Sequence, residues 1–458
     1  MTPAKPDDDP LLLQPAVVCP RRFRAQRTKL SPRMRQPRPS AMPATADRCG
    51  SRCRVPTPAA PRPTPTHPRS TVPQSTVGAI VGSWSGRVVR FDSRSRRGKS
   101  IVVTEPEGDE YSDMATPLAA WLAERFDGVS HVEVGAFDRP SGGYSAETLI
   151  VPITVTTPAS TEDRTIVLRR EMPEPPVYPV QVAVDNEIEI QWRVMSALAT
   201  HADVPIAPLL GYETDAEVLG SPFFVMDFIG GDIPREDPAY VLAGFYADAD
   251  PAARELMATR CIDVMAGVHA VDIETADLGW LSDSDINDGH RQLKIWRDYA
   301  ERELDGRPHD LMMAAFDRVA DELPKTDTTV LTWGDARLGN VIWQDFRPAC
   351  LTDFEAAALA PPEMDLGWCL MFEQWSHALA GIEMLPGIPS TELQVEHYVK
   401  VSKHEVADIG PWVLFAAARY AAIVVRIMNR WVDRGLLDAD QTVYLDPIAP
   451  VLRPLLDT

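Results

Sequence analysis

Residues 331–355, which read LTWGDARLGNVIWQDFRPACLTDFE, constrain the fold of this chain more than any other stretch. They contain two small polar clusters, Asp335 with Asn340 and Asp353 with Glu355. Apolar, β-prone runs precede and separate the clusters at residues 330–332, 341–343 and 351–352. This pattern predicts a strand, a loop, a short strand, a turn and another short strand. A hairpin of that size would bring the two clusters to one edge.

Oxygen-bearing side chains gathered at one edge favour the chemistry of hard cations. Mg²⁺ takes oxygen ligands, usually one or two carboxylates, and leaves positions for phosphate oxygens. A carboxylate that does not bind the cation can accept a proton from an attacking hydroxyl. The simpler alternative is that Asp335, Asn340 and Asp353 only form turns, and it would be favoured for any one of them. It accounts less well for all three at this spacing.

The charge of the chain is divided unevenly. Residues 1–100 carry a net charge of +15 and the remainder −36, within a total of −21. Because the first hundred residues also hold 16 prolines and show no lasting periodicity, we expect a disordered tail over residues 1–104. An Arg-rich transit segment and a true start at Met114 are the alternatives. The acidic remainder argues against nucleic acid as the main partner.

The six cysteines are dispersed and form no disulfide framework. Free thiols are typical of a reducing compartment, so we expect a cytoplasmic protein. No run of about 18 apolar residues occurs, so no membrane span is expected. The most apolar stretch, residues 412–428, is interrupted by Arg419 and Arg426. The sequence does not indicate an oligomeric state.

Upstream of the polar clusters the pattern is first β-like and then helical. A glycine pair in Ser141-Gly142-Gly143-Tyr144-Ser145 lies between two expected strands, where backbone N–H groups could approach phosphates, although such a pair is more often only a turn. The expected strands are residues 131–137, 148–156 and 164–170, and the expected helices are residues 184–199, 252–269, 292–304 and 309–323.

The motif WGDxRLGN followed by TDFE resembles the catalytic loop and metal-binding turn of the aminoglycoside phosphotransferase family, a branch of the protein-kinase-like fold. The family carries His-Gly-Asp, then Asn, then Asp-Trp or Asp-Phe before Glu. Trp333 replaces that His, which is not the base, so the departure concerns packing more than chemistry. VLRR at residues 167–170 and the stretch at residues 387–427 resemble the acyl-CoA-dehydrogenase-associated branch, and the resemblance extends over residues 130–435.

The resemblance implies a role for each matching residue. Asp335 would accept the hydroxyl proton, and Arg337 would lie near the γ-phosphate of ATP. Asn340 and Asp353 would hold Mg²⁺. Asp365 would brace the catalytic loop through backbone hydrogen bonds.

The resemblance also implies a nucleotide site. Arg169 would replace the family's phosphate-binding Lys, and Arg170 is the alternative, because neighbouring strand residues face opposite ways. Glu187 would pair with it, with Glu189 as second candidate, although Gln191 stands where many relatives have Glu. The complete set of expected cofactor-binding residues is Gly142, Gly143, Tyr144, Ser145, Arg169, Glu187, Met226, Asp227 and Phe228.

The fold implied is α+β, a protein-kinase-like two-lobe fold preceded by the disordered tail. Residues 105–228 would form a β-rich, nucleotide-binding N-lobe. Residues 229–458 would form a mostly helical C-lobe with the catalytic and substrate-binding groups.

The function implied is ATP- and Mg²⁺-dependent transfer of the γ-phosphoryl group to a hydroxyl of a small molecule. A catalytically weak, nucleotide-binding pseudokinase is the alternative, because Trp333, Arg169 and Gln191 depart from the family pattern. A protein kinase is less favoured, because Asp353-Phe354 is followed by Glu rather than Gly. The sequence does not identify the acceptor.

Overall fold

The computed structural model describes residues 111–140, 146–182, 184, 187–236, 238–439 and 447–457. All of these lie within one compact unit, residues 74–458. The predicted tail and the glycine-containing loop at residues 141–145 lie outside the described residues. The proposed boundary between residues 228 and 229 stays a prediction.

The first part of the described chain is a five-stranded antiparallel sheet with strand order β1-β2-β3-β5-β4. Its strands are β1 (His131–Val134), β2 (Glu147–Thr156), β3 (Thr161–Arg170), β4 (Leu209–Glu213) and β5 (Phe223–Asp227). Side chains alternate between the two faces, so Ile166 and Leu168 of β3 join one core cluster and Val167 joins the other. The three expected strands are therefore confirmed, with shifted ends.

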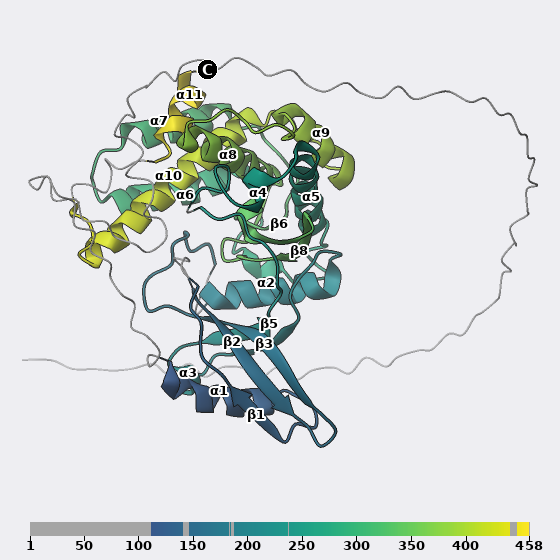
Figure 1. The fold of residues 1–458 in the computed structure, drawn as a ribbon. Coiled ribbons are helices and arrows are strands. Elements are labelled where there is room, and N and C mark those ends of the chain that lie inside the picture. The colour runs from purple at the N-terminus through teal and green to yellow at the C-terminus, as the bar shows by residue number, and fades with distance from the viewer. Residues whose placement is uncertain are drawn as a thin grey trace, which may run out of the picture. The chain divides into compact units, whose positions relative to one another are not determined.

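Helices cover both faces of this sheet, and we call this assembly the N-lobe. The helix α1 (Ala115–Ala123) packs its Leu118, Trp121 and Leu122 on the same cluster as Ile166 and Leu168. The helix α2 (Glu187–His201) covers the opposite face, and its Ile188, Val194 and Leu198 join the core that continues into the helical part. In Figure 1, α2 lies between the sheet and the helices, and α1 lies beyond the sheet. Two short helices complete the N-lobe, η3 (Ser112–Met114) and α3 (Ala216–Leu219).

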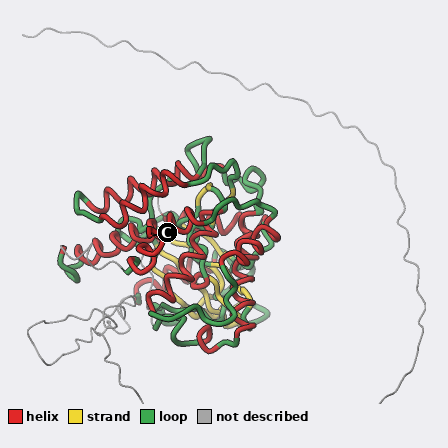
Figure 2. Tube along the Cα trace, turned by 90° about the horizontal axis from the view of Figure 1, so that it is seen from above, coloured by secondary structure: helices red, strands yellow, loops and turns green. Residues whose placement is uncertain are grey.

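The rest of the described chain is mostly helical, and we call it the C-lobe (Figure 2). Its helices are α4 (Phe245–Asp248), α5 (Pro251–His269), η4 (Gly279–Leu281), α6 (Gly289–Leu304), α7 (Asp310–Glu322), η5 (Leu338–Asn340), α8 (Glu363–Ala380), α9 (Thr391–Ser402), α10 (Gly410–Asp433) and α11 (Ala449–Asp457). Two small antiparallel sheets pair β6 (Val330–Thr332) with β9 (Ala358–Ala360) and β7 (Val341–Gln344) with β8 (Arg347–Leu351). The predicted α+β architecture, with a β-rich part followed by a helical part, is confirmed.

The helix α10 is the centre of the C-lobe and packs against α6, α7 and α8. Within the described residues it is the one helix long and apolar enough to cross a membrane, but 94% of its most apolar window is buried inside the protein. At the crossing of α8 and α10, Gly367 faces the backbone of Trp412, and a Cβ placed on Gly367 would lie 2.8 Å from the Trp412 carbonyl oxygen. Only glycine lets the two helices approach this closely.

We expect Gly367→Ala to lower the free energy of unfolding by about 1–3 kcal/mol, because the added methyl group overpacks the contact with Trp412. Denaturant unfolding monitored by circular dichroism measures this change. Gly279→Ala is the matched control, because a Cβ at Gly279 meets no atom within 4 Å. Equal stabilities for the two variants would contradict the packing argument.

Candidate active site

The β7–β8 hairpin brings the two polar clusters of the sequence together. Val341 pairs with Leu351 across the hairpin. One step farther, the N–H and the Oγ1 of Thr352 both donate to the carbonyl oxygen of Asn340, each at 3.0 Å. Asn340 and Asp353 therefore lie at the same end of the hairpin, as the sequence predicted.

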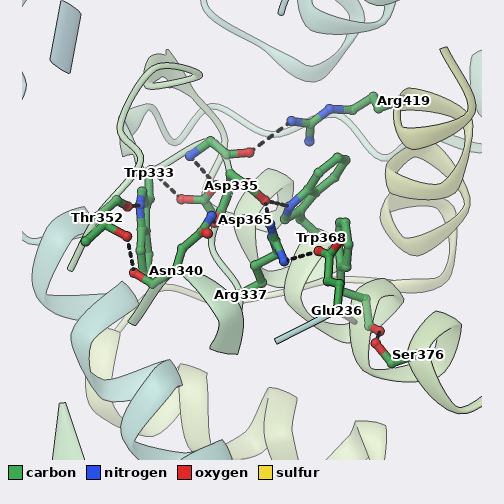
Figure 3. Close-up of polar contacts among 12 residues, drawn as sticks. Glu236, Trp333, Asp335, Arg337, Asn340, Thr352, Asp365, Trp368, Ser376 and Arg419 are labelled. Carbon is green, nitrogen blue, oxygen red and sulfur yellow. Dashed lines mark hydrogen bonds and ion pairs between the residues drawn. The ribbon is translucent and has the colours of Figure 1, made fainter. Parts of the chain in front are cut away.

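The loop before the hairpin is held by one buried carboxylate and one glycine. Both oxygens of Asp365 accept backbone N–H groups, from Trp333 at 2.6 Å and from Gly334 at 2.9 Å (Figure 3). Gly334 has φ +90°, and a Cβ there would lie 2.1 Å from the carbonyl oxygen of Ala356. This position therefore requires glycine, and the bracing role expected of Asp365 is confirmed.

Trp333, which stands where the family pattern has His, is fully buried. Its indole N–H donates to the carbonyl oxygen of Thr352 at 2.7 Å, and its ring stacks on Phe354 with 5.6 Å between ring centroids. The Trp side chain thus ties the catalytic loop to the turn that carries Asp353. The departure from the family motif changes how the loop is packed and leaves the loop anchored.

His269 and Tyr398 extend the hydrogen-bond network of Asp365. The Nε2 of His269 lies 2.9 Å from Asp365, and its Nδ1 lies 2.7 Å from the hydroxyl of Tyr398. Both ring nitrogens of His269 are therefore used inside the protein, and the side chain is buried. This geometry gives His269 a structural role.

Arg419 of α10 places a buried positive charge against this loop. Its guanidinium donates to the carbonyl oxygens of Gly334 and Met364, at 3.3 and 3.4 Å. It lies between the rings of Trp296 and Trp368, at 4.6 and 4.5 Å from their centroids. Burial lowers the pKa of Arg419 to about 10, so the group stays charged at neutral pH.

Asp335, the predicted proton acceptor, is 5% exposed and is held by three side chains. The indole N–H of Trp368 donates to its Oδ1 at 2.6 Å, and the Nε of Arg337 donates to the same oxygen at 3.1 Å. The hydroxyl of Tyr178 lies 3.2 Å from its Oδ2 and donates to it. Sequence reasoning missed Trp368 and Tyr178. For Trp368 a signal existed, because it lies one helical turn after Asp365.

Arg337 connects Asp335 to residues 231–236, which we call the linker between the lobes. Its Nη1 lies 2.7 Å from Glu236, and its guanidinium lies over the ring of Phe372 at 5.0 Å. Burial alone would lower the pKa of Arg337, but the carboxylates of Asp335 and Glu236 outweigh it and raise that pKa well above its ordinary value. Glu236 was not predicted from sequence.

Arg169 and Arg170 face opposite sides of β3. Arg169 donates to Thr148 Oγ1 and Gln191 Oε1, both at 3.0 Å, and lies 3.1 Å from Asp353. Arg170 turns away and pairs with Glu147 at 2.5 Å. Arg169 therefore belongs to the site and Arg170 to the outer face of the N-lobe.

The expected pairing of Arg169 with Glu187 is wrong, because another residue of α2 contacts Arg169. Gln191, one turn along α2, makes the hydrogen bond instead. Glu187 is buried, and its Oε1 has no hydrogen-bond partner. Burial first, and the nearby Glu171 second, raise the pKa of Glu187 from 4.5 to about 7.

The adenine contact expected at residues 226–228 stays a prediction, and two of the backbone N–H groups there already have partners. The N–H of Asp227 donates to the Pro208 carbonyl at 2.9 Å, and the N–H of Phe228 donates to the Thr165 carbonyl at 3.1 Å. Both donors are thus committed to the sheet, and none of Met226, Asp227 and Phe228 lines the cavity described next. The expected phosphate loop, Gly142 to Ser145, lies outside the described residues.

A cavity of about 880 Å³ lies between the two lobes. The predicted residues that line it are Asp335, Arg337, Asp353 and Arg169, joined by Glu355 and by linker residues 231–236. Asn340 is buried next to β7 and does not line the cavity. Among the described residues no group of three or more His, Cys, Asp and Glu side chains could hold a metal ion.

We expect Glu187→Gln to stabilise the protein above neutral pH. Because the folded carboxyl has a pKa near 7 and the unfolded one near 4.5, the folded state binds the proton more tightly. The free energy of unfolding therefore falls as pH rises from 4.5 to 7, and the substitution removes this fall. Denaturant unfolding across this pH range measures it, and parallel pH profiles for the wild type and the variant would contradict it.

We expect Asp365→Asn to lower the free energy of unfolding by about 3 kcal/mol, because the new NH₂ group faces backbone donors in a buried site. Glu363→Gln is the matched control on the same turn of α8. Glu363 is also buried, but its Oε2 has no partner and burial raises its pKa, so its neutral replacement costs nothing. Chemical denaturation compares the two variants, and equal losses would contradict a specific role for Asp365.

Comparison with known proteins agrees with this geometry. A family model described as "Phosphotransferase enzyme family", APH, matches residues 142–387. A crystal structure of a Ralstonia eutropha protein provisionally classed as an aminoglycoside phosphotransferase is 24% identical, with a TM-score of 0.56, covering 75% of this chain and 98% of that one. This likeness shows the two-lobe, kinase-like fold.

Curated relatives cover a similar stretch. Acyl-CoA dehydrogenase family member 10 of Mus musculus is 30% identical over 217 residues, covering 46% of this chain and 18% of the relative. Acyl-CoA dehydrogenase family member 11 of Homo sapiens is 24% identical over 310 residues, covering 64% of this chain and 37% of the relative. The chain thus spans well under half of the length of these relatives. On the family match and the catalytic-loop geometry together, the chain belongs to the APH phosphotransferase enzyme family.

Proposed function

We propose that this protein uses ATP and Mg²⁺ to transfer the γ-phosphoryl group to a hydroxyl of a small molecule. One observation carries the proposal. The carboxylate of Asp335, which is not one of the proposed cation ligands, lines the same cavity as the Arg169–Asp353 ion pair. Phosphoryl transfer needs positioning and electrostatic stabilisation more than covalent chemistry, and these groups supply both. Membership of a phosphotransferase family supports the reaction class.

Asp335 is the proposed proton acceptor. Its Oδ1 accepts two hydrogen bonds, from Trp368 and Arg337, which use both lone pairs of that oxygen. Its Oδ2 accepts one, from Tyr178, and so keeps one direction for an acceptor hydroxyl. A base at this position also aligns the hydroxyl oxygen for attack.

Asn340 and Asp353 are the proposed cation ligands. The Nδ2 of Asn340 donates to the Asp335 carbonyl at 2.9 Å, so the amide oxygen is the atom left for a cation. Asp353 adopts φ +58°, and its side chain is one-third exposed, 33%, at the cavity wall. One amide and one carboxylate fit Mg²⁺, which usually completes its shell with water and phosphate oxygens. Bound there, the cation would neutralise charge on the phosphate chain.

Arg169 is the proposed phosphate-binding cation. Hydrogen bonds from its guanidinium to Thr148 and Gln191 fix its direction, and Asp353 draws it towards the proposed cation site. A guanidinium can bind two phosphate oxygens at once, so Arg serves where a Lys would bind as a point charge. Arg337 is a second cation at the cavity wall, held by Glu236.

The departures from the family motif do not by themselves favour a pseudokinase. Trp333 anchors the loop through Thr352, and Gln191 holds Arg169. The cytoplasmic location expected from the thiols stays a prediction.

We expect Asp335→Asn to abolish phosphoryl transfer and to retain nucleotide binding, because it removes the proton acceptor and leaves Arg169, Asn340 and Asp353 in place. Asp353→Ala should lose the binding that depends on Mg²⁺. Thermal unfolding with Mg²⁺ alone, ATP alone and both together measures binding. A ligand at ~100 times its Kd stabilises the folded state by about 2.7 kcal/mol. ATP consumption measures turnover.

Asp321→Asn is the matched control, since Asp321 is exposed at the end of α7 and away from the cavity. A shift that needs ATP but not Mg²⁺, with no turnover, would favour the pseudokinase. Wild-type turnover by Asp335→Asn would remove Asp335 as the base.

A further inference from the structure

The segment between β3 and α2 is a proline-rich strap, which we define as residues 174–181. Its sequence, EPPVYPVQ, contains Pro175, Pro176 and Pro179. Proline lacks an N–H and fixes φ, so such a segment is stiff and cannot pair as a strand, while its carbonyl oxygens stay available as acceptors. The described strap residues accordingly form neither helix nor strand.

Arginines on one face of α10 hold the outer half of the strap. Arg426 donates to the carbonyl oxygens of Pro176 and Pro175, at 3.2 and 3.0 Å. Arg430, one turn later, also donates to Pro175, and Arg434, the residue that directly follows α10, pairs with Glu174 at 2.7 Å. Because these arginines are four residues apart, they form one row along the helix.

The helix α6 holds the inner half of the strap in the same way. The hydroxyl of Tyr299 donates to the Val177 carbonyl, and Gln292 donates to Gln181 at 2.8 Å. Trp296, on the same face of α6, meets the ring of Tyr178 edge to face, with 6.5 Å between centroids. The strap starts from the N-lobe, but its contacts are with the C-lobe.

This anchoring places Tyr178 against the proposed base. Its ring lines the cavity, and its hydroxyl donates to Asp335 Oδ2 at 3.2 Å. Burial, and then the negative charge of Asp335, raise the pKa of Tyr178 well above its ordinary value, with Glu355 acting in the same direction and Arg337 against it. The phenol therefore stays protonated and remains a hydrogen-bond donor.

We propose that the strap is a wall of the acceptor site and that Tyr178 is a positioning residue, whose hydroxyl turns the Asp335 carboxylate so that the free direction of Oδ2 faces the acceptor hydroxyl. The inference rests on the proposed function, because it takes Asp335 as the base. The other hydrogen bonds hold Oδ1 alone. The carboxylate turns about the Cβ–Cγ bond of Asp335, and within the described residues Tyr178 supplies the one hydrogen bond that restrains this turn at Oδ2; without it the base is held less firmly in line with the attacking oxygen.

The test uses Mg·ATP hydrolysis by the full chain, with water as the acceptor. We expect Tyr178→Phe to lower kcat about tenfold, because the geometry of attack is disturbed, and to leave KM for ATP unchanged. Thermal unfolding checks that the variant folds. If Tyr178 had a purely structural role, the substitution would lower Tm and would not lower kcat while leaving KM for ATP unchanged. Tyr111→Phe is the matched control, because it also removes a tyrosine bond to a carboxylate, Glu147 at 2.8 Å, outside the cavity.

A second variant tests the strap itself. Arg426→Ala removes two carbonyl contacts of the strap by changing a side chain that does not line the cavity, and it should lower kcat through Tyr178 alone. The double variant with Tyr178→Phe should then lose no more than the more damaging single variant. Additive losses would show that the strap does not act through Tyr178 and would overturn the coupling.

A binding measurement makes the test independent of turnover. Calorimetry should show that Tyr178→Phe weakens the Mg·ADP·aluminium fluoride complex about tenfold and leaves Mg·ADP binding unchanged, because only the former mimics the transition state. Equal affinities of wild type and Tyr178→Phe for both ligands, or faster hydrolysis by the variant, would overturn the inference. If Asp335→Asn hydrolyses ATP like wild type, the proposed function itself fails. If Asp335→Asn is inactive and Tyr178→Phe is not impaired, only the strap inference fails.

Discussion

The carboxylate of Asp365 is the interaction on which the rest of the site depends. It accepts the N–H groups of two consecutive loop residues and so fixes the backbone from which Asp335 and Asn340 project. A buried carboxylate costs free energy unless it is fully hydrogen-bonded and offset by positive charge. His269 and the charge of Arg419 supply this compensation, and Arg419 is itself held between two tryptophan rings. The catalytic loop, α5, α8 and α10 are therefore one electrostatic unit.

Two of the cations that line the cavity, Arg169 and Arg337, already have carboxylate partners. Arg169 pairs with Asp353, and Arg337 pairs with Asp335 and Glu236. These contacts hold the side chains in place before any ligand arrives, which lowers the entropy lost on binding. A phosphate chain would compete with the carboxylates for the same guanidinium groups, and a divalent cation would satisfy the carboxylates released. A ligand that binds in such a site would replace existing partners of the guanidinium and carboxylate groups, and the number of charge contacts would change little.

The sequence predicted the parts of the structure that depend on local spacing. The strands around the catalytic loop, the hairpin that joins Asn340 to Asp353 and the brace by Asp365 follow from short-range pattern and family motif. The errors concern quantities that local pattern does not contain. Periodicity shows which side of α2 is buried, and Glu187 and Gln191 lie one turn apart on that side. It does not show which turn of the helix lies opposite Arg169, so Glu187 was favoured over Gln191.

Contacts between distant segments were missed for the same reason. Tyr178 and Asp335 are 157 positions apart, and nothing in a proline-rich connection indicates where it will be pinned. The adenine contact expected at residues 226–228 stays a prediction, and the use of the Asp227 and Phe228 N–H groups in other backbone hydrogen bonds becomes visible only once β3, β4 and β5 are paired.

The strap has a mechanical consequence for the two lobes. The chain passes between the lobes at the linker, where Asp232 and Trp343 exchange backbone hydrogen bonds at 2.8 and 2.9 Å. The strap is a second crossing, stiffened by proline and clamped by the arginines of α10. Together with the core that α2 shares with the helical part, these two crossings connect the lobes along both sides of the cavity. A change in the width of the cavity would therefore have to bend the strap or the linker.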